Sequence, residues 1–559
     1  MEQAKPRKRR LLRKLIVWLV LAGIAALLCV RFFGGPGLPA RAVLVLKVDD
    51  TLPIAPAEGF EALLLGQRGP LLPALHTALA RGARDARVEG IFLDLGEGSL
   101  GLADARELRR LFVEFRKARK PVIAYADNLS LSAWYVASAC DKVVMNPAGR
   151  LQLTGISLRV MLFGDLLKRL KLKADLERIG RYKTAFETVT DNKLSPSSRE
   201  ALQRLSDAVW EEFVGELAES RGIERKALED LIDQGPLSAR AAEEKKLVDA
   251  LKWRDELDAY VKEASGGTGD LVTFERYAAH AARGASSARI AYLPLAGTIV
   301  ASGTGRGVIA ADAVISQLAT LRDDSSIAAI VIRIDSPGGD AVASASLFRA
   351  IRSARLRKPV VVSMGASAAS GGYYLAAAAD YIVAQPFTLT GSIGIFGGKI
   401  AADELLAWAE ISRETFRHGA FAGLYDPFEP FDDAKRALIR RELEDMYDRF
   451  VRDVAEGRHL PVEAVEAVAG GRVWTGGDAC RHKLVDALGG LDAAIDKAKE
   501  LARIEGAAAL VLWPPPKAWY EQLLAAEKDP SGLGRLLTLQ RALCAGRPLA
   551  LLPFMLGWE

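Results

Sequence analysis

The sequence predicts an α/β fold built of two tandem domains and preceded by one N-terminal transmembrane helix. The first observation is an internal repeat, in which two stretches roughly 240 residues apart share one order of motifs. The second is that short β-branched runs alternate with helical stretches in both copies, which is typical of parallel βα units. The third is the length of the chain, because 559 residues are too many for one hydrophobic core and fit two domains of about 230 residues each.

The two copies differ where they would carry chemistry. Matching segments are residues 90–95 with 330–335, 120–123 with 358–361, 153–155 with 389–391, and Leu-Val-Asp-Ala-Leu at 247–251 and again at 484–488. The second copy has Ser370 where the first has Leu131, and the first has Lys183 where the second has Ala422. A serine in one half and a lysine in the other suggest one composite site.

The N-terminus combines a basic cluster with an apolar run. Residues 1–14 contain seven basic side chains and one acidic one, a balance of +6, so the other residues together contribute −1 to the formal net charge of +5. The rest of the chain lacks the basic field that nucleic-acid binding requires, and no nucleic-acid partner is expected. The run from Leu15 to Val30 is shorter than the ~20 residues of a typical span, but Lys14 and Arg31 can reach the interface. We expect residues 1–35 to be an uncleaved anchor with a cytoplasmic N-terminus; a cleaved signal peptide is the alternative.

The remaining elements follow in order. Residues 41–48 and 290–295 alternate as strands and open the two repeats, expected at 36–264 and 288–512. The glycine-rich and serine-rich stretch 265–287 is expected as the linker. Residues 513–559 belong to neither repeat, and they either strap onto the domain surface or touch the membrane. The four cysteines show no metal or disulfide spacing, so neither a metal nor another cofactor is expected.

Two turns of the second repeat could position reacting groups. The strand 327–334 leads through Asp335 into Ser336-Pro337-Gly338-Gly339, where outward backbone N–H groups could hold an oxyanion. After the strand 360–364, two serines compete as nucleophile. Ser367 follows Gly365 in the manner of a nucleophile elbow, but Ala369 replaces the closing glycine. Ser370 adjoins Gly371 and a helix start, although a serine there is more commonly a helix N-cap.

A serine nucleophile needs a base. The five histidines all fall outside the motif turns; they are His76, His280, His418, His459 and His482. Lysine can act as the base if burial keeps it neutral, although most lysines are solvated charges.

Several segments resemble the SppA-type signal peptide peptidases (protease IV) of the long tandem form. The resemblance spans roughly residues 40–510 of the chain and both repeats. On the lysine side it is carried by residues 180–187, 194–196 and 199–200, although Thr188-Val189 replace the family's usual Pro-Phe. On the serine side it is carried by residues 336–339, 368–374, 389–394 and 471–476.

The resemblance implies a ClpP/crotonase-like fold and a Ser-Lys dyad. Ser370 would be the nucleophile, Lys183 the general base and Ser392 the residue that orients the lysine, with the Gly371 and Gly339 N–H groups as the oxyanion hole. It further implies a serine endopeptidase in the bacterial cytoplasmic membrane, with its catalytic body outside the cytoplasm, that degrades cleaved signal peptides and other apolar peptides. We expect the dyad to form within one chain and several chains to close a tetramer-like ring.

Three other functions stay open at this stage. One is an acyl-CoA-handling crotonase, which needs neither the Ser-Lys pair nor an anchor. Another is a non-catalytic membrane scaffold with a decayed site, and the third is a peptidase that acts on a membrane-bound scaffold protein.

Overall fold

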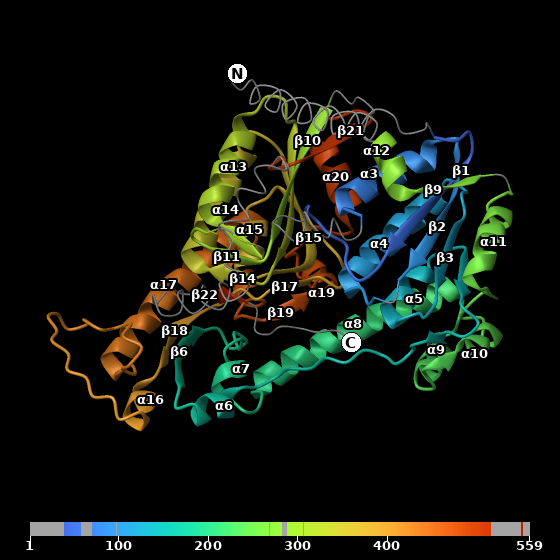
Figure 1. The fold of residues 1–559 in the computed structure, drawn as a ribbon. Helices are drawn as coiled ribbons and strands as arrows, with labels where there is room; N and C mark the ends of the chain where they lie inside the picture. Colours follow the sequence, from blue (N-terminus) through green and yellow to red (C-terminus); the bar gives the residue numbers. More distant parts are fainter. Residues whose placement is uncertain are drawn as a thin grey trace, which may run out of the picture.

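The computed structural model describes residues 38–56, 70–96, 98–267, 269–281, 288–303, 305, 307–515 and 549–551 (Figure 1). Its strands are β1 (Ala42–Val48), β2 (Val88–Leu95), β3 (Val122–Ala126), β4 (Lys142–Met145), β5 (Arg150–Leu151), β6 (Lys173–Ile179), β7 (Leu237–Ser238), β8 (Ala250–Leu251), β9 (Asp270–Thr273), β10 (Ala288–Ala296), β11 (Thr298–Val300), β12 (Val308–Ala310), β13 (Ala329–Ser336), β14 (Gly338–Asp340), β15 (Val360–Ala369), β16 (Tyr381–Ala384), β17 (Leu389–Gly391), β18 (Ile395–Ala401), β19 (Val473–Thr475), β20 (Ala487–Leu488), β21 (Ala508–Leu512) and β22 (Leu549–Leu551).

Helices alternate with these strands. They are α3 (Leu72–Arg84), α4 (Leu102–Arg116), α5 (Leu131–Ala137), α6 (Gly164–Arg169), α7 (Glu187–Thr190), α8 (Pro196–Arg221), α9 (Arg225–Ile232), α10 (Ala239–Glu244), α11 (Leu257–Ala264), α12 (Phe274–Ala281), α13 (Ala311–Asp323), α14 (Ala341–Arg355), α15 (Gly371–Ala376), α16 (Asp403–Trp408), α17 (Asp433–Arg458), α18 (Val462–Glu466), α19 (Gly476–Arg481) and α20 (Leu491–Leu501), with a 3-10 turn at Arg254–Glu256. The predicted α/β class is therefore confirmed.

Each repeat is built around a mainly parallel sheet. The described strands of the first repeat pair in the order β8-β4-β3-β2-β1-β9, and every pairing is parallel. Those of the second pair in the order β19-β17-β15-β13-β10-β21, with β16 and β20 to the side and only β19 antiparallel. The apolar runs of β2 and β13 are buried along almost their whole length, as parallel strands covered on both faces require.

The same contacts recur in both repeats and support the duplication. Trp134 of α5 donates its indole N–H to Leu247 O at 3.0 Å. Tyr373 of α15 donates its hydroxyl to Leu484 O at 2.9 Å. Because Leu247 and Leu484 begin the two Leu-Val-Asp-Ala-Leu segments, the alignment that places Leu131 at the position of Ser370 holds in space.

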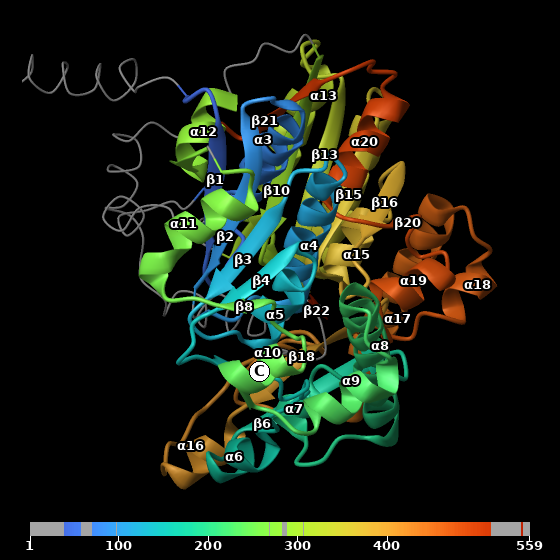
Figure 2. The same ribbon diagram turned by 90° about the vertical axis from the view of Figure 1, so that its right-hand side faces the viewer.

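The two repeats pack tightly together. Helices α3, α4 and α20 lie between the two sheets, and α4 of the first repeat contacts β15 of the second (Figure 2). The fully buried carboxylate of Glu107 on α4 accepts hydrogen bonds from Arg333 Nη1 at 3.1 Å and from Gln385 Nε2 at 2.6 Å. One continuous apolar cluster includes Leu108 and Phe112 from the first repeat with Val331 and Val361 from the second. Such shared burial fixes the position of one repeat against the other.

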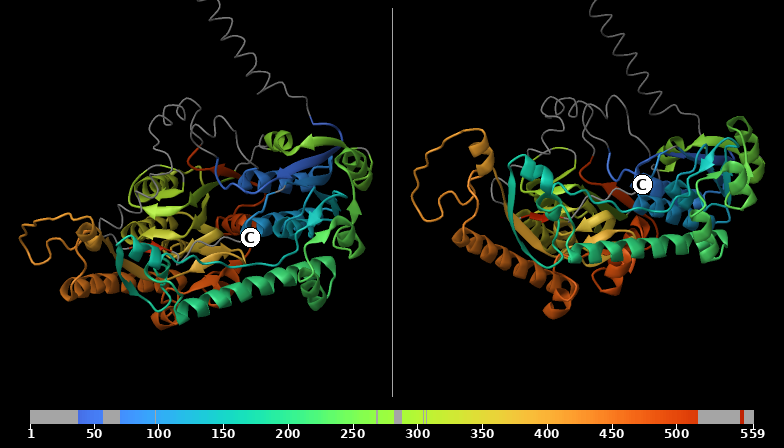
Figure 3. Two further views of the ribbon diagram at one scale, coloured as in Figure 1. Left: turned by 60° about the horizontal axis from the view of Figure 1, so that its bottom comes forward. Right: turned by 90° about the horizontal axis from the view of Figure 1, so that it is seen from below.

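A third sheet joins the repeats directly. Its described strands run β12-β11-β14-β22-β18-β6, so β6 of the first repeat pairs antiparallel with β18 of the second, from Ile179 opposite Ile395 to Lys173 opposite Ala401. The orange segment that contains α16 projects from the body beside this pairing (Figure 3).

Two segments differ from their expected form or lie outside the described residues. Stretch 265–287, expected as a linker, contains β9 and α12; β9 pairs with β1 just as β21 pairs with β10. The glycines at 266 and 267 have positive φ and make only a turn before β9. The predicted membrane span at 15–30 is outside the described residues, within which no helix is long and apolar enough to cross a membrane.

Candidate active site

Ser370 occupies a strained position at the junction of β15 and α15. Its backbone has φ 55° and ψ −114°, a conformation that L-residues rarely adopt. It stands at the N-cap of α15, but its side chain makes no capping hydrogen bond. The ordinary interpretation of this residue as a helix cap is therefore wrong, and its hydroxyl is available for another partner.

Lys183 reaches that hydroxyl from the other repeat. The lysine lies four residues beyond the end of β6, and the pairing of β6 with β18 carries this segment across to the second repeat. Lys183 Nζ lies 2.6 Å from Ser370 Oγ. The structure thus brings together the serine and the lysine that the sequence analysis singled out, and it does so within one chain.

Ser392 provides two further contacts of the Lys183 amine. Lys183 Nζ lies 3.1 Å from Ser392 Oγ and 3.1 Å from the carbonyl oxygen of Ser392. Ser392 itself has φ 52°, and its N–H donates to Arg472 O at 2.7 Å. This left-handed turn directs both oxygens of Ser392 to the lysine.

The site excludes water. Lys183, Ser370 and Ser392 each have 0% of their surface exposed. Burial lowers the pKa of the Lys183 amine well below its usual value, because the charged form loses its hydration and no carboxylate of the described residues offsets that loss. Burial of this kind favours the neutral amine, which is the form that can accept a proton.

Ser367 has a different partner. Its hydroxyl donates to Asp335 Oδ1 at 3.1 Å, and its backbone N–H donates to the same oxygen at 2.9 Å. Burial raises the pKa of Asp335, while these hydrogen bonds oppose that rise. Ser367 therefore ties the end of β13 to β15, and the partner of its hydroxyl is the Asp335 carboxylate.

The two glycines proposed for the oxyanion hole lie close to one another. Gly371 is the first residue of α15, and a Cβ there would lie 3.3 Å from Gly338 Cα. A Cβ on Gly339 would lie 2.6 Å from Ile299 N, so only glycine fits against β11. The expected Pro-Gly-Gly turn at a helix start is instead the short strand β14, and α14 begins after it with Asp340 as its N-cap. The difference arises because β11 and β22 supply strand partners that lie far away in the sequence.

Gly471 is a residue whose role the sequence analysis did not identify. A Cβ on Gly471 would lie 2.5 Å from both Cα and Cβ of Lys183, and its φ is 85°. Gly394 packs against Gly471, and a Cβ on Gly394 would lie 2.9 Å from Gly471 Cα and 3.2 Å from Lys183 Cδ. The sequence signal was present, since both glycines fall in quoted family motifs, but their proximity to the lysine is a tertiary contact.

A polar cluster holds the lysine segment at its exposed side. The Tyr182 N–H donates to Gly470 O at 2.7 Å, and its hydroxyl donates to Glu200 Oε1 at 2.9 Å. The Arg472 guanidinium stacks over the Tyr182 ring at 4.9 Å and also donates to Glu200 at 3.0 Å. These contacts fix the backbone on both sides of Lys183.

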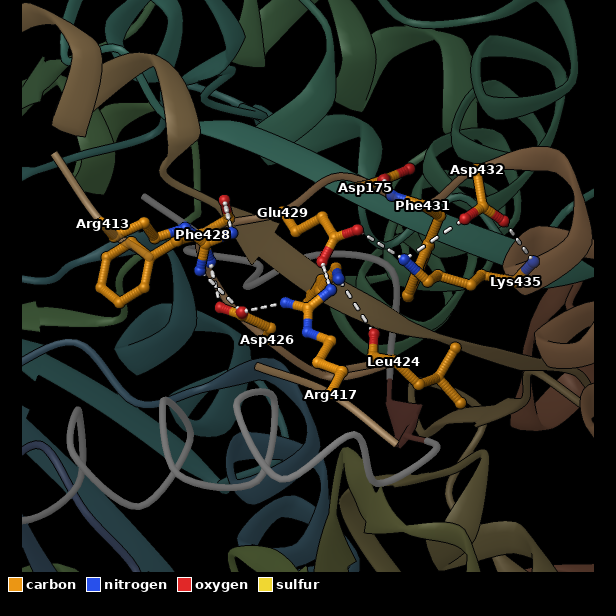
Figure 4. Close-up of polar contacts among 11 residues, drawn as sticks. Asp175, Arg413, Arg417, Leu424, Asp426, Phe428, Glu429, Phe431, Asp432 and Lys435 are labelled. Carbon is orange, nitrogen blue, oxygen red and sulfur yellow. Dashed lines mark hydrogen bonds and ion pairs between the residues drawn. The ribbon is translucent and has the colours of Figure 1, made fainter. Parts of the chain in front are cut away.

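The projecting segment after α16 is braced by ion pairs (Figure 4). Asp426 accepts from Arg413 at 2.7 Å and from Arg417 at 2.8 Å, and Glu429 pairs with Arg417 and with Lys435. The chain then returns to β6, where Asp175 accepts from the Phe431 N–H at 2.6 Å. This network anchors the β6–β18 pair on which the position of Lys183 depends.

The described residues contain no group of three or more His, Cys, Asp or Glu side chains suited to a metal ion. Within the same residues, Cys140 and Cys480 are free thiols.

Known protein families and individual proteins are similar to this chain. The model of "Peptidase family S49" matches residues 114–266 and 352–505, and the model "Clp protease" matches residues 292–387. The chain is 32% identical over 449 residues to "Serine protease SPPA, chloroplastic" of Arabidopsis thaliana, covering 78% of this chain and 66% of that protein. It is 31% identical to "Protease 4" of Haemophilus influenzae, covering 76% of this chain and 72% of the relative. It is 29% identical to "Protease 4" of Salmonella typhi, covering 89% of this chain and 84% of that protein.

The fold, the buried serine and these relatives define a serine peptidase of the α/β class. The chain belongs to peptidase family S49, and the family model matches once in each repeat. Peptides are therefore its substrates, and the predicted enzyme class is confirmed.

Proposed function

We propose that the protein is a membrane-anchored serine endopeptidase with a Ser-Lys dyad that degrades cleaved signal peptides and other apolar peptide segments. The observation that carries the proposal is the 2.6 Å distance between Lys183 Nζ and Ser370 Oγ in a site without exposed surface. A nucleophile and a base within hydrogen-bond reach, with the base held by a third group, form the arrangement that covalent catalysis requires.

Each group has a step in the reaction. The neutral Lys183 amine takes the hydroxyl proton as Ser370 Oγ attacks the peptide carbonyl. The N–H groups of Gly371 and Gly339 stabilise the negative oxygen of the tetrahedral intermediate. The Lys183 ammonium then protonates the leaving amine, and an acyl-enzyme remains on Ser370. Water then attacks that ester while Lys183 accepts a proton from it, and the Lys183 ammonium gives this proton to Ser370 Oγ as the acyl bond breaks, which returns both residues to their starting state.

Ser392 is the orienting residue in this mechanism. Its hydroxyl and carbonyl oxygens both lie 3.1 Å from Nζ, so the amine is held in place before and after it carries the extra proton. Donation from the ammonium to these two oxygens stabilises the charged form at the step where it is needed.

The peptidase proposal is tested by active-site labelling and by digestion. A fluorophosphonate probe should label the wild-type protein at Ser370 and should leave Ser370→Ala unlabelled. Synthetic signal peptides should be cut within their apolar core, whereas charged peptides of equal length should be cut slowly. Absence of the label in a folded wild-type protein would favour a non-catalytic scaffold, and preference for charged peptides would refute the substrate class.

The location and assembly belong to the same proposal. The basic cluster at 1–14 and the apolar run at 15–30 support an anchor in a bacterial cytoplasmic membrane, with the repeats on the extracytoplasmic side. Reporter fusions at Gly37 should be active only outside the cytoplasm, and activity only inside would refute this topology. We further propose that the chains assemble into a ring, which mass measurement of the detergent-solubilised protein would detect.

A further inference from the structure

The Ser336 hydroxyl lies beside the proposed oxyanion hole and makes both of its hydrogen bonds with backbone groups. It donates to Gly297 O at 2.6 Å and accepts from the Gly338 N–H at 3.1 Å. Ser336 has 0% of its surface exposed, so bulk water does not compete for either bond. A hydroxyl has one proton to donate and two lone pairs that accept, so the two bonds are compatible and together fix its orientation.

The bond to Gly338 fixes a peptide group in a segment with little conformational restriction of its own. Gly338 has φ 106° and is followed by Gly339, and two adjacent glycines can adopt other backbone conformations at little cost. Capture of the Gly338 N–H holds the peptide plane between Pro337 and Gly338. The next peptide plane carries the Gly339 N–H, which is one of the two donors of the proposed oxyanion hole. The direction of that donor therefore depends on the Ser336 hydroxyl.

The bond to Gly297 fixes the strand that packs against Gly339. The Gly297 N–H donates to Asp335 O at 2.9 Å and the Gly297 carbonyl oxygen accepts from Ser336, so two consecutive residues hold this glycine on both sides. β11 begins with the next residue, and a Cβ on Gly339 would lie 2.6 Å from the backbone nitrogen of Ile299 in that strand. Loss of the Ser336 hydroxyl would thus loosen both the strand of the proposed oxyanion hole and the strand that supports it.

The backbone of Ser336 also contacts the segment that carries the nucleophile. Ser336 lies opposite Ala368 in the pairing of β13 with β15, and Ala368 is two residues before Ser370. A Cβ on Gly372 would lie 2.8 Å from the Ser336 carbonyl oxygen, so the first turn of α15 packs directly on this residue. Ser336 therefore joins the strand of the proposed oxyanion hole to the helix start beside the nucleophile.

We propose that Ser336 is a positioning residue of the oxyanion hole, whose hydroxyl keeps the Gly339 N–H directed toward the substrate carbonyl oxygen. The inference rests on the proposed peptidase function. Negative charge develops on that oxygen only as Ser370 attacks, so a misdirected donor slows the chemical step more than it weakens substrate binding. Loss of a whole donor costs about a hundredfold to a thousandfold in kcat, and partial misdirection should cost about tenfold or more.

The first test is Ser336→Ala, which leaves the Gly338 N–H and Gly297 O without the hydroxyl that binds both. We expect kcat to fall about tenfold or more, with KM changed by less than about threefold. A peptide aldehyde forms a hemiacetal with Ser370 whose oxygen takes the place of the oxyanion, so the affinity for the aldehyde should fall about as much as kcat. The corresponding peptide alcohol forms no such bond and should bind equally well to both proteins.

Two further variants sharpen the comparison. Ser336→Cys is close in size to the wild type but has only a weak donor and acceptor, so its kcat and aldehyde affinity should lie between those of Ser336→Ala and wild type. Ser367→Ala removes a serine hydroxyl from the neighbouring strand, where it donates to Asp335, and should behave as wild type. If Ser336→Ala does not fold, the comparison of Ser336→Cys with wild type decides between the same outcomes.

The second test follows the Gly338 amide without catalysis. Its hydrogen exchange should be about tenfold faster or more in Ser336→Ala than in wild type and in Ser367→Ala, because the N–H has lost its acceptor. Unchanged kcat and aldehyde affinity in a folded Ser336→Ala, with Ser370→Ala inactive, would overturn the inference and leave the proposed function intact. Equal losses of aldehyde and alcohol affinity would show general damage to the site and would also overturn it. If Ser370→Ala cut peptides at the wild-type rate, the proposed function would fail and the inference with it.

Discussion

Gly471 and Lys183 touch through their backbones: a Cβ on Gly471 would lie 2.5 Å from the Cα of Lys183. Each residue comes from a different repeat, and the Tyr182 N–H donates to Gly470 O beside this contact. The lysine can therefore extend to Ser370 only because the facing segment has no side chain at this position.

Gly471→Ala should displace Lys183 and strongly reduce activity. A shift of about 1 Å in a catalytic group can cost about a hundredfold in rate, so we expect at least that loss in kcat. Gly470→Ala is the matched control, because its φ is also positive at 64° but its nearest neighbour, Arg181 N, is 3.7 Å away. That control should lose about 1 kcal/mol of stability and retain most of its activity. Similar losses of activity in the two variants would contradict the proposed contact.

Ser370→Ala should lower peptidase activity by about ten-thousandfold or more, because it removes the attacking oxygen. Ser367→Ala should keep most of the activity, because the Ser367 hydroxyl donates to Asp335, whereas the hydroxyl beside Lys183 is that of Ser370. Steady-state rates of the two variants and the wild type should be compared after circular dichroism has shown that each protein is folded. Comparable losses in both variants would refute Ser370 as the nucleophile.

Lys183→Met should lower activity about a thousandfold, since a general base contributes on that order. The wild-type rate should rise with pH as the buried amine loses its proton, because only the neutral form accepts the proton of Ser370. The burial-lowered pKa of Lys183 gives the direction of this profile. Substantial activity in Lys183→Met, or a rate that falls as the pH rises from acid to neutral, would contradict the assignment of Lys183 as the general base.

The same substitution should stabilise the protein. The unfolded chain binds a proton on Lys183 up to its usual pKa of 10.5, whereas the folded chain releases it at a lower pH. Between these two pKa values the unfolded state binds more protons, so wild-type stability rises with pH and is reduced near neutrality. Lys183→Met should therefore raise Tm at pH 7, and the gain should shrink toward pH 10.5. A gain that does not depend on pH would indicate better packing instead.

Mixed expression of the two inactive chains should not restore activity. Ser370→Ala and Lys183→Ala each lack half of a pair that lies within one chain at 2.6 Å. A site shared between chains would recover about a quarter of the wild-type rate by random mixing. Recovery near that level, measured on co-expressed and co-purified protein, would show that Ser370 of one chain works with Lys183 of another.

The sequence was sufficient to predict those features that depend on local motifs and on local periodicity. The repeat, the parallel βα units and the pair Ser370 and Lys183 could all be identified from residue patterns. The positions of Gly471, β14 and β22 could not, because each depends on a partner from a distant segment. The stretch 265–287 has the composition of a linker, and only its pairing with β1 reveals β9.

The pairing of β6 with β18 also has a consequence for biosynthesis. Lys183 is made long before Ser392, which lies 209 residues further along the chain. Domains fold in order as they leave the ribosome, so the first repeat can be complete while the second is still being translated. During that interval Lys183 has no Ser370 beside it, so the proposed dyad is absent from the unfinished polypeptide. The duplication thus delays the assembly of the proposed dyad until most of the chain has been synthesised.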